Sequence, residues 1–150
     1  GQVSKTITAK EYQAMHTKRK RGAKAPLTAP MYKSIRMRSG LEVRYAAHLD
    51  AMVWRGEIER WDYEPEKFLI GKSCSYTPDF RVTIGDRVFF IETKGYKREA
   101  GRIKFRTTAK LNPMYGFIMV GESNGRFVLR ENLTTLDNTL LAKFTTREGK

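Results

Sequence analysis

The fold of this chain is decided by the stretch YTPDFRVTIGDRVFFIETKG, which occupies residues 76–95. Gly85 followed by the polar Asp86 is a common signal for a two-residue hairpin turn. The sequence therefore predicts an antiparallel hairpin whose strands cover about residues 76–84 and 87–94. Pairing the two strands outward from the turn also predicts their register.

This register places two carboxylates side by side. Asp79 lies opposite Glu92, and directly paired residues share a face of the sheet, with Cβ atoms about 4.5–5.5 Å apart. Lys94 shares the face of Glu92, whereas Thr93 points to the other face. Because like charges that face each other destabilise a sheet, a bound cation is the simplest compensation. Two oxygen-ligand side chains with water are a usual way of holding Mg²⁺.

A helix is predicted upstream of the hairpin, from Ser39 to about Gly56. Ser39 and Glu42 have the spacing of a capping box. Apolar residues recur at helical spacing and form one stripe along this helix. They are Leu41, Tyr45, Leu49 and Met52. Glu42 has two interpretations: a capping residue at the start of the helix, or a functional carboxylate at the edge of the core.

The other expected elements alternate along the chain. A short helix near residues 9–16 and an extended linker over 22–33 precede the core, which begins near Ser39. A first strand over 61–70 is interrupted by Pro65, which indicates a sheet edge or a bend. After the hairpin we expect a helix over 99–110, strands over 114–120 and 126–130, and a helix near 133–142.

This order of elements predicts an α/β fold (mixed α+β) in which a central mixed β-sheet is flanked by helices. Residues 93–120 form a strand–helix–strand unit, which is right-handed if its strands are parallel. We expect an extended basic N-terminal arm over residues 1–38 and a single folded domain over residues 39–150.

Length and composition fit a soluble globular protein with a modest core. The chain has 150 residues, of which 40% are hydrophobic and 30% are charged. No apolar run approaches the roughly 18 residues that span a membrane. Cys74 is the only cysteine, which excludes a disulfide framework and a cysteine-based zinc site. One cysteine is compatible with a reducing cytoplasm, which is the expected location.

The net charge of +13 favours a polyanionic partner, because contacts to phosphates release counterions. Residues 1–38 carry nine of these net charges, with Glu11 as the only acid. A basic arm that binds nucleic acid is one interpretation, and a solubilising tail is the other. An anionic membrane surface is disfavoured, because no strongly amphipathic helix accompanies the charge. The candidate DNA-binding residues of the arm are Lys18, Arg19, Lys20, Arg21, Lys33, Arg36 and Arg38.

Three ordered blocks of the sequence match a known pattern. Pro78-Asp79 followed by Glu92-Thr93-Lys94 resembles the P-D…(D/E)-x-K signature of the restriction-endonuclease-like nucleases, the PD-(D/E)xK superfamily. Together with the block at residues 39–42, these motifs resemble the phage endonuclease I type of Holliday-junction resolvase. The resemblance covers about residues 38–96 and does not extend to the arm.

The resemblance implies a role for each matching residue. Asp79 and Glu92 are metal-binding carboxylates, the Thr93 backbone carbonyl is a further ligand, and Glu42 completes the metal site from the helix. Lys94 orients or helps to activate the attacking water and stabilises charge on the phosphate. The expected cofactor is Mg²⁺ or Mn²⁺, with one or two ions per site. Such ions supply the activated water and the neutralised phosphate that phosphodiester hydrolysis needs.

Residues that follow the motif, most of them basic, are candidates for contacts to the DNA backbone. Their alternative interpretation is a solvated, basic helix face. They are Tyr96, Lys97, Arg98, Arg102 and Lys104. His48 is interpreted as an ordinary helix residue, because a histidine–metal nuclease needs a different set of residues.

The expected function is a metal-dependent DNA endonuclease that acts on branched or structured DNA, such as four-way junctions. The resemblance implies a homodimer of phage or mobile-element origin that acts inside the bacterial host. A site-specific or nicking DNA endonuclease is an alternative within the same class. A non-catalytic nucleic-acid-binding module is an alternative from another class, and it is disfavoured because paired carboxylates repel phosphate.

Overall fold

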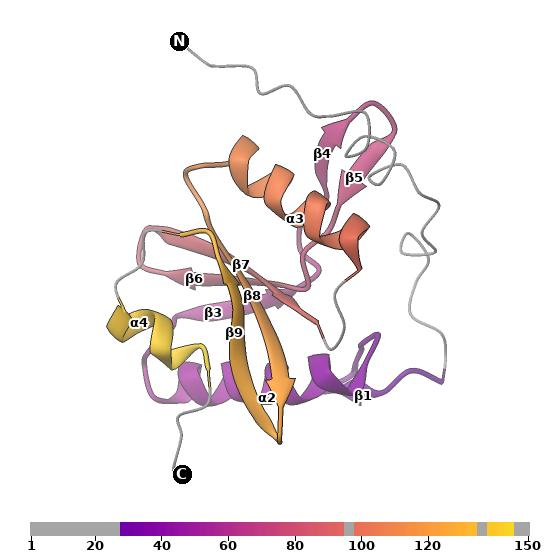
Figure 1. Cartoon of the computed structure of the whole chain (residues 1–150). Helices are drawn as coiled ribbons and strands as arrows, with labels where there is room; N and C mark the ends of the chain where they lie inside the picture. The colour runs from indigo at the N-terminus through magenta and orange to yellow at the C-terminus, as the bar shows by residue number, and fades with distance from the viewer. Residues whose placement is uncertain (1–27, 95–97, 135–137, 146–150) are drawn as a thin grey trace.

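The computed structural model describes residues 28–94, 98–134 and 138–145, and its fold is mixed α+β around a central sheet (Figure 1). This sheet has five strands in the order β3-β6-β7-β8-β9. The strands are β3 (Arg60–Tyr63), β6 (Phe80–Ile84), β7 (Arg87–Thr93), β8 (Gly116–Ser123) and β9 (Arg126–Asn132). Among the described helices, none is long and apolar enough to cross a membrane.

The sheet is mixed because only β7 and β8 run parallel. β6 is antiparallel to both β3 and β7, and β8 is antiparallel to β9. Helix α3 (Glu99–Leu111) lies between β7 and β8 in the chain. This confirms the strand–helix–strand unit that was expected over residues 93–120. The C-terminal ends of β7 and β8 consequently lie at the same edge of the sheet.

The β6–β7 hairpin has the register that its turn predicts. Gly85 takes a φ of +60° in this turn, a conformation that glycine adopts without strain. The paired residues are Phe80 with Ile91, Val82 with Phe89, and Ile84 with Arg87. Asp79 lies one residue before the first of these pairs, and Glu92 one residue after it.

The strand expected over residues 76–84 is divided into two. β5 (Cys74–Tyr76) pairs with β4 (Phe68–Gly71) in a separate two-stranded sheet, and β6 begins only at Phe80. Pro78 lies between the two strands and has no N–H to donate to a strand ladder. The chain therefore bends at residues 77–79 and moves from one sheet to the other.

The strand expected over residues 61–70 is also divided, into β3 and β4. Glu64 takes a φ of +43° directly before Pro65, so the extended backbone ends there. β3 lies at the edge of the central sheet. This agrees with the edge or bend that Pro65 indicated.

Helix α2 (Gly40–Trp54) begins and ends where the sequence predicts. The Ser39 hydroxyl accepts a hydrogen bond from the Glu42 backbone N–H, which makes Ser39 the N-cap. Gly56 follows the helix with a φ of +73°. All four residues of the predicted apolar stripe are buried.

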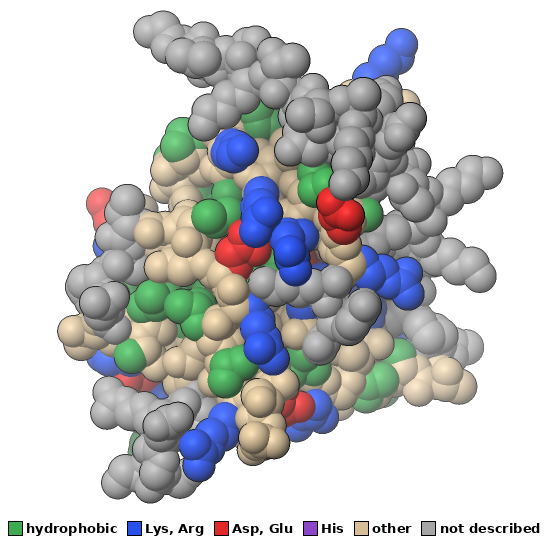
Figure 2. All heavy atoms as spheres, in the orientation of Figure 1, with side chains coloured by type: hydrophobic (Ala, Val, Ile, Leu, Met, Phe, Trp, Pro, Cys, Tyr) green, Lys and Arg blue, Asp and Glu red, His purple; other side chains and the backbone are tan. Residues whose placement is uncertain are grey.

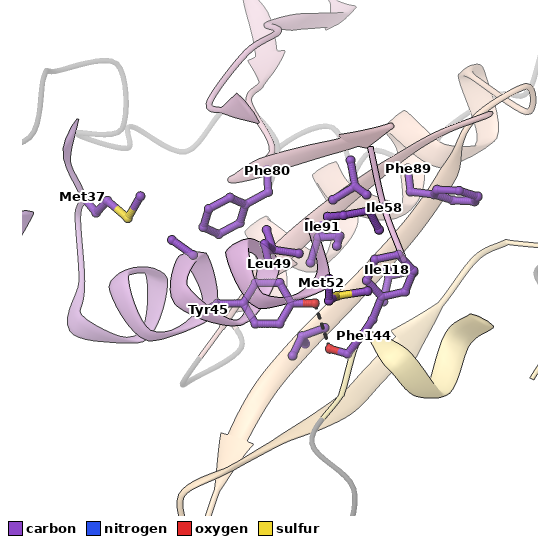
Figure 3. Close-up of a cluster of buried hydrophobic side chains, with 13 residues drawn as sticks. Met37, Tyr45, Leu49, Met52, Ile58, Phe80, Phe89, Ile91, Ile118 and Phe144 are labelled. Atoms are coloured by element: carbon purple, nitrogen blue, oxygen red, sulfur yellow. Dashed lines mark hydrogen bonds between the residues drawn. The ribbon is translucent and has the colours of Figure 1, made fainter. Parts of the chain in front are cut away.

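Two hydrophobic clusters lie on opposite faces of the sheet. α2 packs on one face, where Tyr45, Leu49 and Met52 meet strand residues such as Ile91 (Figure 3). α3 and the β4–β5 sheet pack on the other face, around Phe90, Phe105, Phe117 and Tyr76. Because both faces are covered, β7 is buried from Phe89 to Thr93.

The segment before Ser39 is folded from about Pro30 onward, which corrects the expected linker. β1 (Met31–Tyr32) and β2 (Ile35–Arg36) form a hairpin. The Tyr32 hydroxyl donates to the Asp50 carboxylate on α2. Met37 is fully buried in the cluster beneath α2, so the folded unit includes residues upstream of Ser39. This segment packs on α2 because its aromatic and apolar side chains reach the core.

The end of the chain differs from the prediction in its boundaries. β8 and β9 extend further than expected and meet at a turn in which Asn124 and Gly125 take positive φ. The last helix, α4 (Asn138–Lys143), begins later than expected. The helix predicted near residues 9–16 lies outside the described residues.

Candidate active site

Buried polar side chains are few in the described part of the chain, and most of them are predicted site residues. Glu42 is 3% exposed, Asp79 2%, Glu92 1% and Thr93 5%; the other such residue is Thr108. A buried carboxylate is unfavourable unless it is paired or hydrogen-bonded. The surroundings of each acid therefore show how its burial is compensated.

Asp79 lies in the bend before β6 and reaches across to β7. Its Oδ2 accepts hydrogen bonds from the Thr93 backbone N–H at 2.8 Å and from Thr93 Oγ1 at 2.9 Å. Its backbone carbonyl accepts from the Glu64 N–H at 2.8 Å. Asp79 is thus fixed by the backbone and the side chain of Thr93, the residue that the register predicted on the other face of the sheet from Asp79 and Glu92.

Glu92 is held by two donors of different character. The Tyr76 hydroxyl donates to its Oε2. Lys94 Nζ lies 3.2 Å from its Oε1, with 14% of the lysine side chain exposed. The Lys94 backbone N–H donates to the Val120 carbonyl at 2.9 Å, which anchors the end of β7 to β8.

Glu42 combines a capping role with a link to the sheet. Its Oε2 accepts from the Ser39 hydroxyl at 3.1 Å, and its Oε1 accepts from the Tyr63 hydroxyl at 3.3 Å. Burial, followed by the negative charges of Glu42, Glu64 and Asp79, raises the pKa of the Tyr63 phenol. Tyr63 therefore lies within the electrostatic influence of two of the predicted site acids.

The three predicted acids do not form one group of ligands in the described part of the chain. Within the described ranges, no three histidine, cysteine, aspartate or glutamate side chains gather in a group that could hold a metal ion. Glu42 is therefore not brought into one ligand group with Asp79 and Glu92. Mg²⁺ is usually held through one or two carboxylates, with water and substrate phosphates as the other ligands. Asp79 and Glu92, at the ends of neighbouring strands, are a donor set of that kind.

Several predicted DNA-binding residues have acidic partners. Lys33 Nζ lies 2.8 Å from Asp50 Oδ2, and Arg38 Nε lies 2.7 Å from Glu64 Oε1. Arg36 and Arg98 are exposed, and Arg102 and Lys104 are half-buried on α3. Figure 2 shows lysine and arginine side chains gathered over α3 and β9. Lys18, Arg19, Lys20, Arg21, Tyr96 and Lys97 lie outside the described residues.

Three residues near the site had no assigned role in the sequence analysis. Tyr76 and Tyr63 are the tyrosines that bond the glutamates. Gly121 is the third, because a Cβ there would lie 3.0 Å from the Lys94 carbonyl oxygen and 2.4 Å from Arg130 Nε. Tyr76 is the first residue of the stretch 76–95, but its hydrogen bond to Glu92 depends on how the β4–β5 sheet packs. No signal in the sequence identifies the other two.

Asp79, Glu92 and Lys94 lie where β7 ends at the edge of the sheet, as two buried carboxylates with an ammonium group beside Glu92. Such a site is suited to binding a hard cation and to directing a cationic side chain at a phosphate. Comparisons with family models, with curated proteins and with solved structures found no match to this chain. A functional assignment therefore depends on the chemistry of the site itself.

Proposed function

We propose that this chain is a metal-dependent DNA endonuclease with a restriction-endonuclease-like core. One observation carries the proposal: Glu42, Asp79 and Glu92 are the buried acids of the described chain, and they are the acids of the recognised motifs. Buried carboxylates do not stabilise a hydrophobic core, because the loss of their hydration must be offset by hydrogen bonds or by a paired charge. A hydrolytic site that must bind a cation does require them.

The resemblance suggests a role for each residue, and the contacts of the side chains are compatible with these roles. Asp79 and Glu92 would hold the divalent ion, with the Thr93 carbonyl as the further ligand that the resemblance implies. When bound, Mg²⁺ supplies a more acidic water and neutralises charge on the phosphate. Lys94 lies beside Glu92, where its ammonium group can donate to the attacking water or to a phosphate oxygen. Glu42 acts from α2 through its contact with Tyr63.

DNA is the proposed substrate because the chain carries a net charge of +13. Exposed arginines such as Arg36 and Arg98 add positive charge to the surface, which favours contacts with phosphates. The resemblance to junction resolvases favours branched DNA, with two copies of the chain making paired cuts. The substrate class is thus DNA of branched or otherwise structured form.

Asp79→Asn tests the proposal against a matched control, Asp86→Asn. Both changes remove one charge from the same hairpin, but Asp86 is exposed in the turn at the far end from the site. Asparagine keeps an acceptor oxygen for the Thr93 donors, so the fold should persist. We expect Asp79→Asn to abolish Mg²⁺-dependent cleavage while DNA binding remains, and Asp86→Asn to cleave normally.

The assay uses a four-way junction, a matched linear duplex and a supercoiled plasmid, each with Mg²⁺ or with EDTA. Absence of metal-dependent cleavage of all three would contradict the nuclease proposal and leave a binding module. Equal cutting of junction and duplex would retain the nuclease but remove the preference for branched DNA.

A further inference from the structure

The Glu92 carboxylate is held on both of its oxygens by groups that differ in charge. Tyr76 donates to Oε2 as a neutral phenol, whereas Lys94 approaches Oε1 as a cation. A cation that binds Glu92 is repelled by an ammonium group but not by a phenol. The two donors therefore have different consequences for metal binding.

Tyr76 is fixed by a hydrophobic cluster that joins α3 and the β4–β5 sheet to Phe90 of the hairpin. It is the last residue of β5, is 3% exposed, and lies in the cluster formed by α3 and the β4–β5 sheet. The same segment continues through Pro78 to Asp79. One bend of the chain thus places the hydroxyl on Glu92 and, three residues later, the second carboxylate beside Thr93.

We propose that Tyr76 is a positioning residue that fixes Glu92 as a metal ligand, an inference that rests on the proposed nuclease function. Because its hydroxyl bonds to Oε2, Oε1 is the oxygen that would serve as the ligand of an ion. Carboxylates that ligate metals are themselves hydrogen-bonded, and loss of such a partner typically weakens metal affinity or activity about 10–100-fold. Tyr76 thereby sets the metal concentration at which the site works.

The test compares Tyr76→Phe with Tyr45→Phe in the full chain. Tyr45 is a matched control because it is also buried and its hydroxyl bonds to the Phe144 carbonyl at 2.9 Å, within the cluster under α2 (Figure 3). Affinity for Mn²⁺ is measured without DNA, from the electron paramagnetic resonance signal of the free ion. Thermal unfolding in EDTA gives the effect on stability.

We expect Tyr76→Phe to raise the Kd for Mn²⁺ about 10–100-fold. The Mg²⁺ concentration for half-maximal cleavage should rise by the same factor, and the rate should recover at saturating metal. Tyr45→Phe should lose stability without a change in Kd. An unchanged Kd in Tyr76→Phe would overturn the positioning role while the nuclease proposal survives.

Two further measurements separate this inference from the proposed function. Wild-type protein that binds no Mn²⁺ and cuts no DNA refutes both. If Tyr76→Phe does not fold, the tyrosine absorption band of the wild type is followed during Mg²⁺ addition, with Asp79→Asn as the blank. A perturbed phenol band in the wild type alone supports the contact with the metal-binding carboxylate, and an unperturbed band overturns it.

Discussion

Replacing Lys94 by Met should strongly destabilise the metal-free protein. The change keeps the length and the apolar stem of the side chain but removes the ammonium group that lies 3.2 Å from Glu92 Oε1. Glu92 then remains in a nearly dry environment without its cationic partner. The expected effect is on the folded state itself, so it is independent of any DNA substrate.

The magnitude follows from the burial of the pair. Glu92 is 1% exposed and the Lys94 side chain 14% exposed, so solvent can replace little of the lost interaction. Removing one partner of a buried ion pair costs about 3–5 kcal/mol. Tyr76 still donates to the carboxylate, which places the expected loss at the lower end, about 3 kcal/mol. For a chain of this size, that corresponds to a fall of about 6–12 °C in Tm.

Urea and thermal unfolding in EDTA measure this loss. Lys67→Met, at an exposed lysine before β4, is the control and should change stability by less than about 0.5 kcal/mol. The double variant Glu92→Gln with Lys94→Met removes both charges. It should recover most of the loss, because a buried pair replaced as a whole is often neutral or stabilising.

Two results would refute this reasoning. A loss below about 1 kcal/mol in Lys94→Met would mean that the pair is solvated or that other groups compensate Glu92. A double variant no more stable than the single variant would mean that the loss does not come from the unpaired charge of Glu92.

Further predictions concern the first turn of α2 and two glycines of β8. Ser39→Ala removes the N-cap and should lower the free energy of unfolding by about 0.5–2 kcal/mol in urea titrations; an unchanged midpoint would count against the cap. Gly116→Ala puts a Cβ 2.2 Å from Phe89 Cδ1 and should cost about 1–3 kcal/mol by thermal unfolding, with cleavage intact at low temperature. Gly121→Ala presses on the Lys94 carbonyl and should reduce cleavage more than stability. If Gly116→Ala reduced cleavage more and Gly121→Ala reduced stability more, the proximity of Gly121 to the site would have no functional meaning.

The hairpin and the ends of α2 were predictable because their signals are local. A glycine–polar pair specifies the turn, and the alternation of side chains then fixes the register. Ser39, Glu42 and Gly56 likewise specify the helix ends through contacts within a few residues. Such contacts do not depend on the rest of the chain, so the sequence alone was sufficient.

The divided strands were not predictable in the same way. Pro65 indicated an interruption, whereas Pro78 was expected within one continuous strand. In both cases the strands on the two sides of the proline belong to different sheets. Which sheet each strand joins is decided by packing against α3, which contributes Phe105 from about 30 residues further along the chain. The contact between Tyr76 and Glu92 depends on that packing, and so it was missed.

The N-terminal hairpin is a second case in which distant contacts decide the structure. Lys33 and Ser34 both take positive φ, at 45° and 69°, although neither residue favours that conformation. The hairpin is held instead by Asp50, which accepts from the Trp61 indole at 2.8 Å and pairs with Lys33 at 2.8 Å. Lys33 was expected to contact DNA, and its pairing with Asp50 reduces its availability for that role.

Thr108 is a buried polar residue whose hydrogen bond is made within its own helix. Its hydroxyl donates to the Lys104 carbonyl at 2.7 Å within α3, a contact that needs nothing beyond its own helix. Asp79 and Glu92, by contrast, are bonded by groups assembled from β5, β7 and the bend between the two sheets. Donors from several elements thus surround buried negative charge in a chain whose net charge is +13. Stability explains this arrangement poorly, because apolar residues in place of a buried ion pair often make a protein more stable. The arrangement is better explained by selection for chemistry at the site, which favours the proposed nuclease over a binding module.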